Sequence, residues 1–237
     1  MIRLDKYLAN LGFGTRSTLP YMIKQWMVQV NGVVEQRPDC KIELGDEIAW
    51  EDMTFEVKTD VTVILYKPAW YVCSEVAEAE YPSYKELLTW CVYANLLHVA
   101  WRLDVDTTGL VICSSDGWFV HRIISPKTHV EKSYLVTCAE AIDDASLRLL
   151  REGVTLEDGY RTLPAQTERL SATEFRLIIH EWKFHQVKRM LEAVRNQVVA
   201  LHRERIGPWS DTGLWPQEWR YLEHAQNDLK DRQKNIM

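Results

Sequence analysis

The chain has 237 residues, of which 46% are hydrophobic, and a formal net charge of −6, so it can bury a sizeable core and is not a disordered chain. Its longest apolar runs, such as 61–66, are too short to span a bilayer, and the first ten residues contain no apolar signal-peptide core. The five widely spaced cysteines form no Cys-x-x-Cys pair and no zinc pattern, which predicts reduced thiols in a cytoplasmic protein without a membrane partner.

The first part of the chain, residues 1–58, is predicted to form a small module of its own. Leucines at helical spacing predict a helix over 4–11, and Ser17 can cap a second helix. An Asn31-Gly32 pair between two short apolar runs predicts a hairpin turn. The module therefore has the order helix, helix, hairpin, and a further turn and strand over 44–50 closes it, while the acidic stretch 46–60 is expected to be a linker.

The second part, residues 59–237, is dominated by strands that helices interrupt irregularly. This pattern predicts an α+β fold with a mixed, mostly antiparallel sheet. The predicted strands lie near 61–66, 110–113, 131–138, 172–181 and 198–207, and the predicted helices lie near 114–125, 142–152 and 184–196.

Two stretches are basic although the whole chain is acidic. Residues 183–205 hold six Lys or Arg and two acids, and residues 121–132 hold three and one. Such stretches can neutralise RNA phosphates. They can equally be ordinary solvated faces, or they can face an acidic protein partner.

One short segment, Arg-Leu-Asp-Val-Asp-Thr-Thr-Gly-Leu (102–110), places an arginine and two acids directly before an apolar strand. Taken alone it reads as a solvated loop. Together with 125–136 and 183–190, however, it resembles the ordered signature segments of bacterial pseudouridine synthases that modify small-subunit (16S) ribosomal RNA. Segments 66–74 and 201–207 point to the same subgroup.

This resemblance covers residues 1 to about 222, and the first module resembles the ribosomal-S4-type RNA-binding domain of that family. It implies a catalytic domain over 59–237 that isomerises a uridine to pseudouridine without cofactor or metal. The implied partner is ribosomal RNA, as the small subunit or its assembly intermediate, and we expect a monomer. The alternative is a non-catalytic RNA-binding or ribosome-assembly factor that keeps the fold.

Carried over residue by residue, the resemblance makes Asp104 the catalytic aspartate, Tyr134 the active-site tyrosine and Lys188 the basic partner of the aspartate. A carboxylate can stabilise or trap the electron-poor sugar carbon that forms when the ribosyl–uracil bond breaks. A cation within about 4–6 Å lowers a carboxylate pKa by about 1–3 units and so keeps it ionised. A phenol can stack on uracil and move the proton that ring carbon 5 loses.

Further residues are predicted to hold the RNA. Arg102 has a planar fork that suits a phosphate, or the gap that an extruded base leaves, although a salt bridge to Asp104 or Asp106 is the simpler role. Asp106 is expected to hold the shape of the loop. The other predicted substrate-binding residues are Lys132, His185, Gln186 and Arg189, and the predicted RNA contacts of the first module are Arg3, Lys6, Arg16 and Lys24.

Four tryptophans stand where the family pattern has glycine: Trp26, Trp70, Trp101 and Trp182. Glycine at such positions supplies a positive φ or room for close approach of the backbone. A tryptophan in left-handed geometry stores strain of about 1–3 kcal/mol and can narrow the uracil pocket. Alternatively, the indole rings stack on bases.

Overall fold

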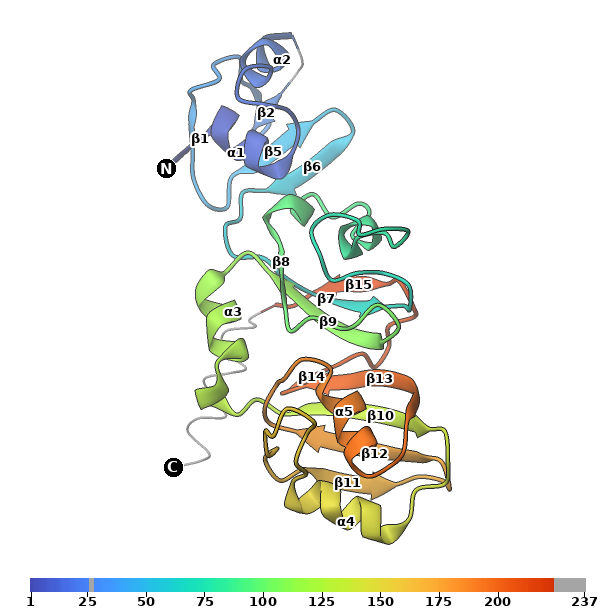
Figure 1. Ribbon diagram of the computed structural model, residues 1–237. Coiled ribbons are helices and arrows are strands. Elements are labelled where there is room, and N and C mark those ends of the chain that lie inside the picture. The colour runs from blue at the N-terminus through green and yellow to red at the C-terminus, as the bar shows by residue number, and fades with distance from the viewer. Residues whose placement is uncertain (26–27, 224–237) are drawn as a thin grey trace.

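The computed structural model describes residues 1–25 and 28–223, so Trp26 lies outside the described residues. Figure 1 shows an elongated molecule with a small N-terminal module at one end and a long twisted sheet occupying the rest. The fold is α+β, and the main sheet is mixed and mostly antiparallel, as predicted.

The N-terminal module comprises the elements β1 to β6. Its first helix covers the predicted range, and Asn31 and Gly32 form the predicted hairpin turn with φ of 52° and 76°. The second helix begins directly after Thr18, one residue later than a Ser17 cap requires. The elements are β1 (Ile2–Arg3), α1 (Leu4–Leu11), α2 (Leu19–Gln25), β2 (Gln29–Val30), β3 (Val33–Val34), β4 (Lys41–Ile42), β5 (Glu47–Trp50) and β6 (Met53–Glu56).

The predicted linker at 46–60 is wrong over most of its length, because β5 and β6 pair there as an antiparallel hairpin. Ile48, Trp50 and Phe55 alternate into the core of the module, while the acids between them face solvent. The acidic composition masks this two-residue alternation, which is the ordinary pattern of a half-buried strand.

The module is attached to the main domain by polar contacts as well as apolar ones. The Tyr93 hydroxyl of the main domain donates to the Glu56 carbonyl of the module at 2.6 Å. Asn95 Nδ2 donates to the Leu11 carbonyl at 2.9 Å, at the C-terminal end of α1. The end of α1 is therefore held by a side chain from the main domain.

Among the described residues, nine strands form the main sheet. Seven of them follow the order β11-β12-β10-β13-β9-β7-β15, while β8 pairs with β9 and β14 pairs with β13. The strands are β7 (Thr62–Lys67), β8 (His98–Ala100), β9 (Thr108–Ser114), β10 (Lys132–Cys138), β11 (Gln166–Arg169), β12 (Glu174–Ile179), β13 (Val198–Ile206), β14 (Trp209–Ser210) and β15 (Trp219–Tyr221). The helices are α3 (Gly117–Ile124), α4 (Asp144–Glu152) and α5 (Gln186–Ala193).

Strand β9 is buried on both faces because each face is covered. Leu110 and Ile112 belong to a core cluster with Phe119 of α3, while Val111 and its alternate neighbours belong to a larger cluster with Tyr84 on the opposite face. This double burial explains the continuous apolar run in the sequence. All five cysteines are free thiols, four of them buried. No helix within the described part of the chain is long and apolar enough to cross a membrane.

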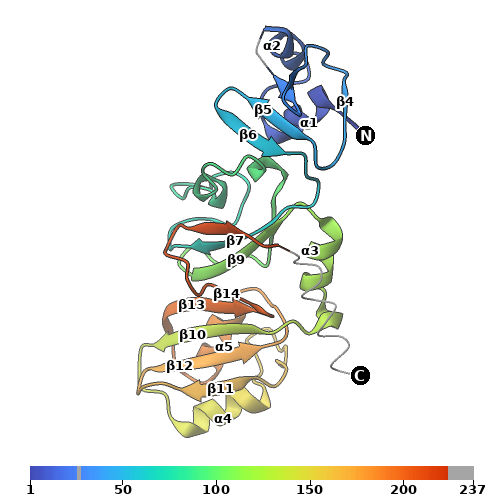
Figure 2. The same ribbon diagram turned by 180° about the vertical axis from the view of Figure 1, so that it is seen from behind.

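The main sheet consists of two halves that meet at β9 and β13 (Figure 2). These two strands run parallel and pair at only two positions, His202 with Thr108 and Arg203 with Gly109. We call this junction the seam. A Cβ on Gly109, whose φ is +109°, would lie 2.3 Å from the Arg203 carbonyl oxygen, so the seam requires glycine there.

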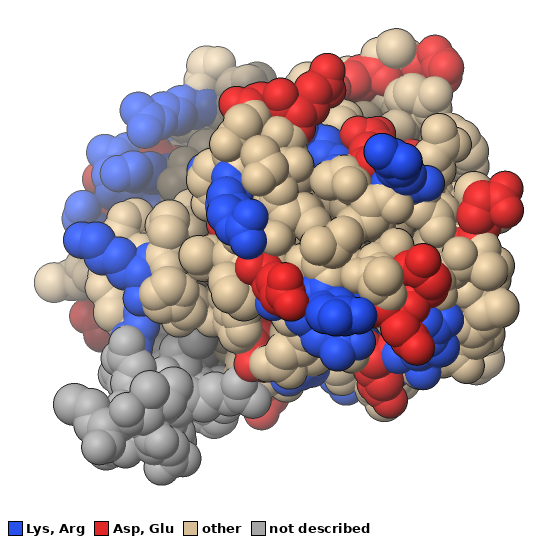
Figure 3. Space-filling model, turned by 60° about the horizontal axis from the view of Figure 1, so that its bottom comes forward, with Lys and Arg blue, Asp and Glu red and all other residues tan. Residues whose placement is uncertain are grey.

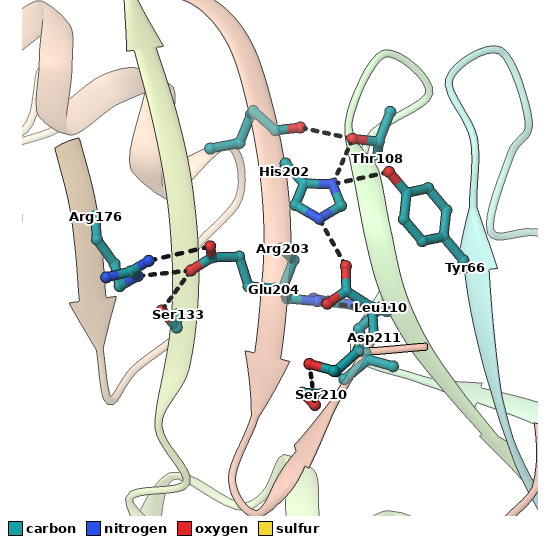
Figure 4. Close-up of polar contacts among 12 residues, drawn as sticks. Tyr66, Thr108, Leu110, Ser133, Arg176, His202, Arg203, Glu204, Ser210 and Asp211 are labelled. Atoms are coloured by element: carbon teal, nitrogen blue, oxygen red, sulfur yellow. Dashed lines mark hydrogen bonds and ion pairs between the residues drawn. The ribbon is translucent and has the colours of Figure 1, made fainter. Parts of the chain in front are cut away.

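Side chains strengthen the seam where the ladder is short, as Figure 4 shows. His202 Nδ1 lies 2.8 Å from Thr108 Oγ1, and its Nε2 lies 2.7 Å from a carboxylate oxygen of Asp211. The buried Arg203 guanidinium donates across the seam to the Leu110 carbonyl at 2.8 Å. Hydrogen bonds from charged groups of this kind are about twice as strong as neutral ones.

Candidate active site

The loop between β8 and β9 carries Asp104, whose side chain is 29% exposed. Lys188 reaches it from α5, with Nζ 3.0 Å from Oδ2 of Asp104. Tyr134 on β10 is almost fully buried and lines the same pocket as both. The structure therefore brings together the three predicted catalytic residues, with Asp104 from one half of the sheet and the other two from the opposite half.

Lys188 is shared between two carboxylates. Its ammonium donates to both oxygens of Asp106, at 2.8 and 2.9 Å, in addition to Asp104. Burial alone would lower the pKa of Lys188, but the hydrogen bonds that its ammonium donates to Asp106 and Asp104 outweigh burial and raise that pKa above its usual value. Burial likewise acts to raise the pKa of Asp106, yet the Lys188 contact holds it below its ordinary value. Asp106 thus anchors the lysine beside Asp104.

Local sequence explains why Lys188 faces the loop. Helix α5 buries Val187, Met190 and Leu191, so its intervening position 188 is turned toward the pocket. The helix starts after His185, which adopts a left-handed conformation with φ of 50°. This bend places His185 Nε2 3.5 Å from Oδ1 of Asp104.

The pocket around Asp104 has a free volume of about 40 Å³. Gln186 lines it and is 4% exposed; its Nε2 donates to Glu181, while its Oε1 has no hydrogen-bond partner among the described residues. Buried acceptors without partners are rare in proteins. The Gln186 oxygen is therefore a buried acceptor, in a residue that lines the pocket, that lacks a donor. The pocket is lined by Arg102, Leu103, Asp104, Thr107, Tyr134, Ile179, Trp182, Lys183, His185, Gln186, Val187, Lys188 and Leu201.

Two predicted substrate-binding residues lie elsewhere. Arg189 does not line the pocket and pairs with Asp158 at 2.6 Å. Lys132 is fully buried, and its ammonium donates to the carbonyls of His180 and Glu181 at 3.3 and 3.5 Å. The predicted contact of Lys132 with substrate is therefore not supported, because its charge is used inside the protein. Arg102, in contrast, is exposed at the pocket wall, and no described residue forms an ion pair with it.

The burial of Lys132 gives a testable pH dependence. Burial, with the Arg203 guanidinium as a second cause, lowers the pKa of Lys132 to about 7. In the unfolded chain it is about 10.4, so between these values the unfolded chain binds the extra proton and stability rises with pH. This lysine alone should raise the free energy of unfolding by about 2 kcal/mol from pH 7 to pH 9. Lys132→Met should remove that rise, as measured by urea unfolding at both pH values.

A surface change of the same type, Lys24→Met, controls for the substitution itself. If Lys132→Met and the wild type show parallel stability curves between pH 7 and pH 9, Lys132 does not titrate in this range and the prediction fails.

The basic stretch 183–205 is largely neutralised in the folded protein. Lys188, Arg189 and Arg205 pair with acids, and Arg203 is buried. In Figure 3, Lys and Arg predominate along the left edge of the face shown, whereas the right-hand part mixes both signs. In the N-terminal module Arg3 pairs with Asp5, while three predicted RNA contacts are exposed: Lys6, Arg16 and Lys24.

Of the three described tryptophans at family glycine positions, two adopt the left-handed geometry that glycine favours. Trp70 has φ of 71° and Trp101 has φ of 67°, whereas Trp182 does not have a positive φ. Each left-handed tryptophan stores strain of about 1–3 kcal/mol. Trp101 recovers part of it, because its indole donates to the Ile123 carbonyl at 2.9 Å and its ring lies 3.7 Å from the Lys132 ammonium.

Two buried cations outside the predicted site residues fix the Asp104 loop. Arg203 donates to the carbonyl of Trp101 at 2.7 Å, and Lys67 donates to that of Val105 at 3.3 Å. Both are fully buried, and burial lowers the pKa of Lys67 to about 8. The segments 66–74 and 201–207 marked both residues in the sequence, but only the fold shows that they hold the loop on either side of Asp104. Within residues 1–25 and 28–223, no group of three or more His, Cys, Asp or Glu could hold a metal ion.

Comparisons with known proteins agree with this geometry. Residues 61–193 match the family of RNA pseudouridylate synthases. The chain is 43% identical to ribosomal small subunit pseudouridine synthase A of Pasteurella multocida over 208 residues. This alignment covers 87% of this chain and 89% of that protein. It is 38% identical to the protein of the same name from Escherichia coli, over 95% and 98% of the two chains. A pseudouridylate synthase crystal structure superposes with a TM-score of 0.67 at 38% identity, over 97% and 99% of the two chains.

Proposed function

The chain belongs to the RNA pseudouridine synthases, and from this premise we propose that it isomerises one uridine of small-subunit (16S) ribosomal RNA, with Asp104 as the reacting carboxylate. The observation that carries the assignment of roles is the contact between Asp104 and Lys188 at the mouth of a pocket that Tyr134 lines. We expect a monomer that acts on small-subunit RNA, either free or in an assembly intermediate.

The reaction requires the target nucleoside to leave its stack, because its glycosidic bond is out of reach inside folded RNA. The pocket has a free volume of only about 40 Å³, so we expect the partly exposed His185 side chain at its rim to move when uracil enters. The exposed Arg102 guanidinium is placed to hold a phosphate or to fill the gap that the extruded nucleotide leaves.

Asp104 then acts on the sugar. As the bond between C1′ of ribose and N1 of uracil breaks, its carboxylate stabilises or bonds the electron-poor C1′. The uracil turns and C5 bonds to C1′, which releases the Asp104 carboxylate if it had bonded there. The proton on C5 then leaves and N1 gains one, so that the product is an isomer of the substrate. Lys188 holds the carboxylate in place and balances its charge.

Tyr134 and Gln186 act on the base in this scheme. The phenol of Tyr134 stacks on uracil and takes part in removing the C5 proton. The partnerless Oε1 of Gln186 accepts a hydrogen bond from a ring N–H, which a uracil offers at N3. Such an acceptor favours uracil over cytosine, whose N3 carries no hydrogen.

Tyr134→Phe separates stacking from proton transfer. The phenylalanine keeps the ring but lacks the hydroxyl, so we expect RNA binding to stay within about twofold while turnover falls about 10²- to 10⁴-fold. Tyr134→Leu should weaken both. Single-turnover conversion and RNA affinity are measured for each variant. Full turnover by Tyr134→Phe would show that the hydroxyl moves no proton.

The substrate is tested by mapping pseudouridines in ribosomal RNA from cells with and without this chain. We expect one small-subunit position to lose its pseudouridine, and purified protein to restore it on a small-subunit transcript. A non-catalytic assembly factor would leave the map unchanged. Loss of a large-subunit position instead would contradict the proposed substrate.

A further inference from the structure

A second cavity lies directly beside the catalytic pocket. Its free volume is about 330 Å³, and Arg102 and Trp182 line both spaces. Small-molecule sites in proteins usually measure about 300–1,000 Å³. The cavity is therefore large enough for an aromatic ring system, and its occupant would be the immediate neighbour of the uracil in the catalytic pocket. We call it the flanking cavity.

Its walls are mainly apolar and include two indoles. Trp101 is 9% exposed and fixed by its bond to the Ile123 carbonyl and by the Lys132 ammonium over its ring. Trp182 is 49% exposed and packs edge-to-face on Trp101, with ring centroids 6.5 Å apart. The fixed Trp101 ring thus supports the half-exposed Trp182 ring. Trp182 can therefore stack on a further ring while Trp101 keeps it in position.

The polar groups of the flanking cavity indicate the charge of its occupant. The Glu181 carboxylate already accepts from the Tyr160 hydroxyl, the Leu163 amide and the Gln186 side chain, at 2.5, 2.7 and 2.9 Å. Arg102 is exposed without an ion pair among the described residues. The charge left to meet a ligand is therefore a guanidinium on the wall between the two spaces, which suits a phosphate.

We propose that the flanking cavity binds the base of a nucleotide adjacent to the target uridine in the same RNA strand, with Trp182 stacked on that base and Arg102 on the phosphate between the two nucleotides. The inference rests on the proposed function, because it places a second nucleotide of the same substrate. Extruding the target leaves its neighbours without a stacking partner. Stacking on an indole replaces that partner and is sequence-tolerant, since every base has a π-face.

The test combines abasic RNA with Trp182 variants. Synthetic RNA hairpins carry the uridine that mapping identifies, with a single abasic residue at each of three positions on either side. Affinities are measured with the Asp104→Asn protein, which binds without turnover, with and without Trp182→Ala. At one flanking position we expect the abasic residue to weaken binding about 5- to 150-fold with Trp182 present and not to weaken it further in Trp182→Ala.

Two more variants define the interaction. Trp182→Phe should retain most of the affinity and Trp182→Leu should not, because only the first preserves an aromatic face. Trp90→Ala, a change at a tryptophan that is 96% exposed and lines neither space, controls for loss of a surface indole.

The outcomes distinguish the inference from its premise. Equal abasic penalties with and without Trp182 at every position, or full affinity in Trp182→Leu, would overturn base stacking in the flanking cavity. Pseudouridine formation by the wild-type protein is followed on the unmodified hairpin in parallel. If the wild-type protein forms pseudouridine but the abasic penalty does not depend on Trp182, only this inference is overturned. If the wild-type protein forms no pseudouridine in small-subunit RNA, the proposed function is overturned.

Discussion

Asp104→Asn is expected to abolish pseudouridine formation, with a loss of about 10⁴-fold or more in single-turnover rate, while RNA affinity stays within about twofold. The amide has nearly the same shape as the carboxylate, but it neither carries a negative charge toward C1′ nor bonds to it. The fold should be unaffected, because Asp104 is partly exposed and Lys188 keeps both contacts with Asp106. The measurement is mass spectrometry of digested transcript.

Asp106→Asn is the matched control. It makes the same change two residues away, on the other carboxylate that contacts Lys188. Because Asp106 positions the lysine and does not react, we expect a loss of about tenfold or less from the weakened ion pair. Retained conversion by Asp104→Asn, or an equally complete loss in Asp106→Asn, would contradict the roles assigned to the two acids.

Gly109→Ala is expected to destabilise the protein by about 4 kcal/mol, which lowers Tm by about 8–16 °C in a domain of this size. The new methyl would lie 2.3 Å from the carbonyl oxygen and 2.7 Å from the amide nitrogen of Arg203. Both atoms belong to the backbone of β13, so only a separation of the two strands relieves the contact. The φ of +109° adds strain for any residue with a Cβ.

Two other glycines separate these causes. Gly159 also has a positive φ, +81°, but a methyl there meets nothing within 4 Å, so Gly159→Ala should show the strain alone, about 1–3 kcal/mol. Gly117 lies at the start of α3 with open space around it and no positive φ, so Gly117→Ala should be neutral or slightly stabilising. Calorimetry of the three variants tests the order. If Gly109→Ala and Gly159→Ala have the same Tm, the close approach of the two backbones at the seam does not add to the destabilisation.

The elements that sequence predicted well are those whose pattern is local. Helix α5 shows its apolar face within one segment, which is why the position of Lys188 on that helix could be anticipated. The sequence predicts the strand β5 within 44–50 but not its hairpin partner β6, because the exposed acids outweigh the buried apolar side chains in the composition of 46–60. The two-residue alternation of Ile48 and Trp50 is nevertheless visible in the sequence.

Residues whose role depends on distant partners could not be placed in the same way. Lys132 stands between the polar residues Glu131 and Ser133, and nothing nearby in sequence shows that Trp101 and two carbonyls just after β12 enclose its ammonium. Arg203 stands in a basic stretch that suggested phosphate binding, yet it bonds to carbonyls about a hundred positions earlier in the chain. Both roles arise from long-range sheet pairing.

The seam has a consequence for catalysis itself. Asp104 belongs to one half of the sheet, whereas Tyr134 and Lys188 belong to the other, and only two residue pairs join the backbones between them. A small rotation of one half about this joint would change the gap between acid and ammonium and the width of the space that must admit uracil. Substrate entry and alignment of the reacting groups therefore both depend on the same narrow joint, whose geometry the contacts of His202 and Arg203 fix.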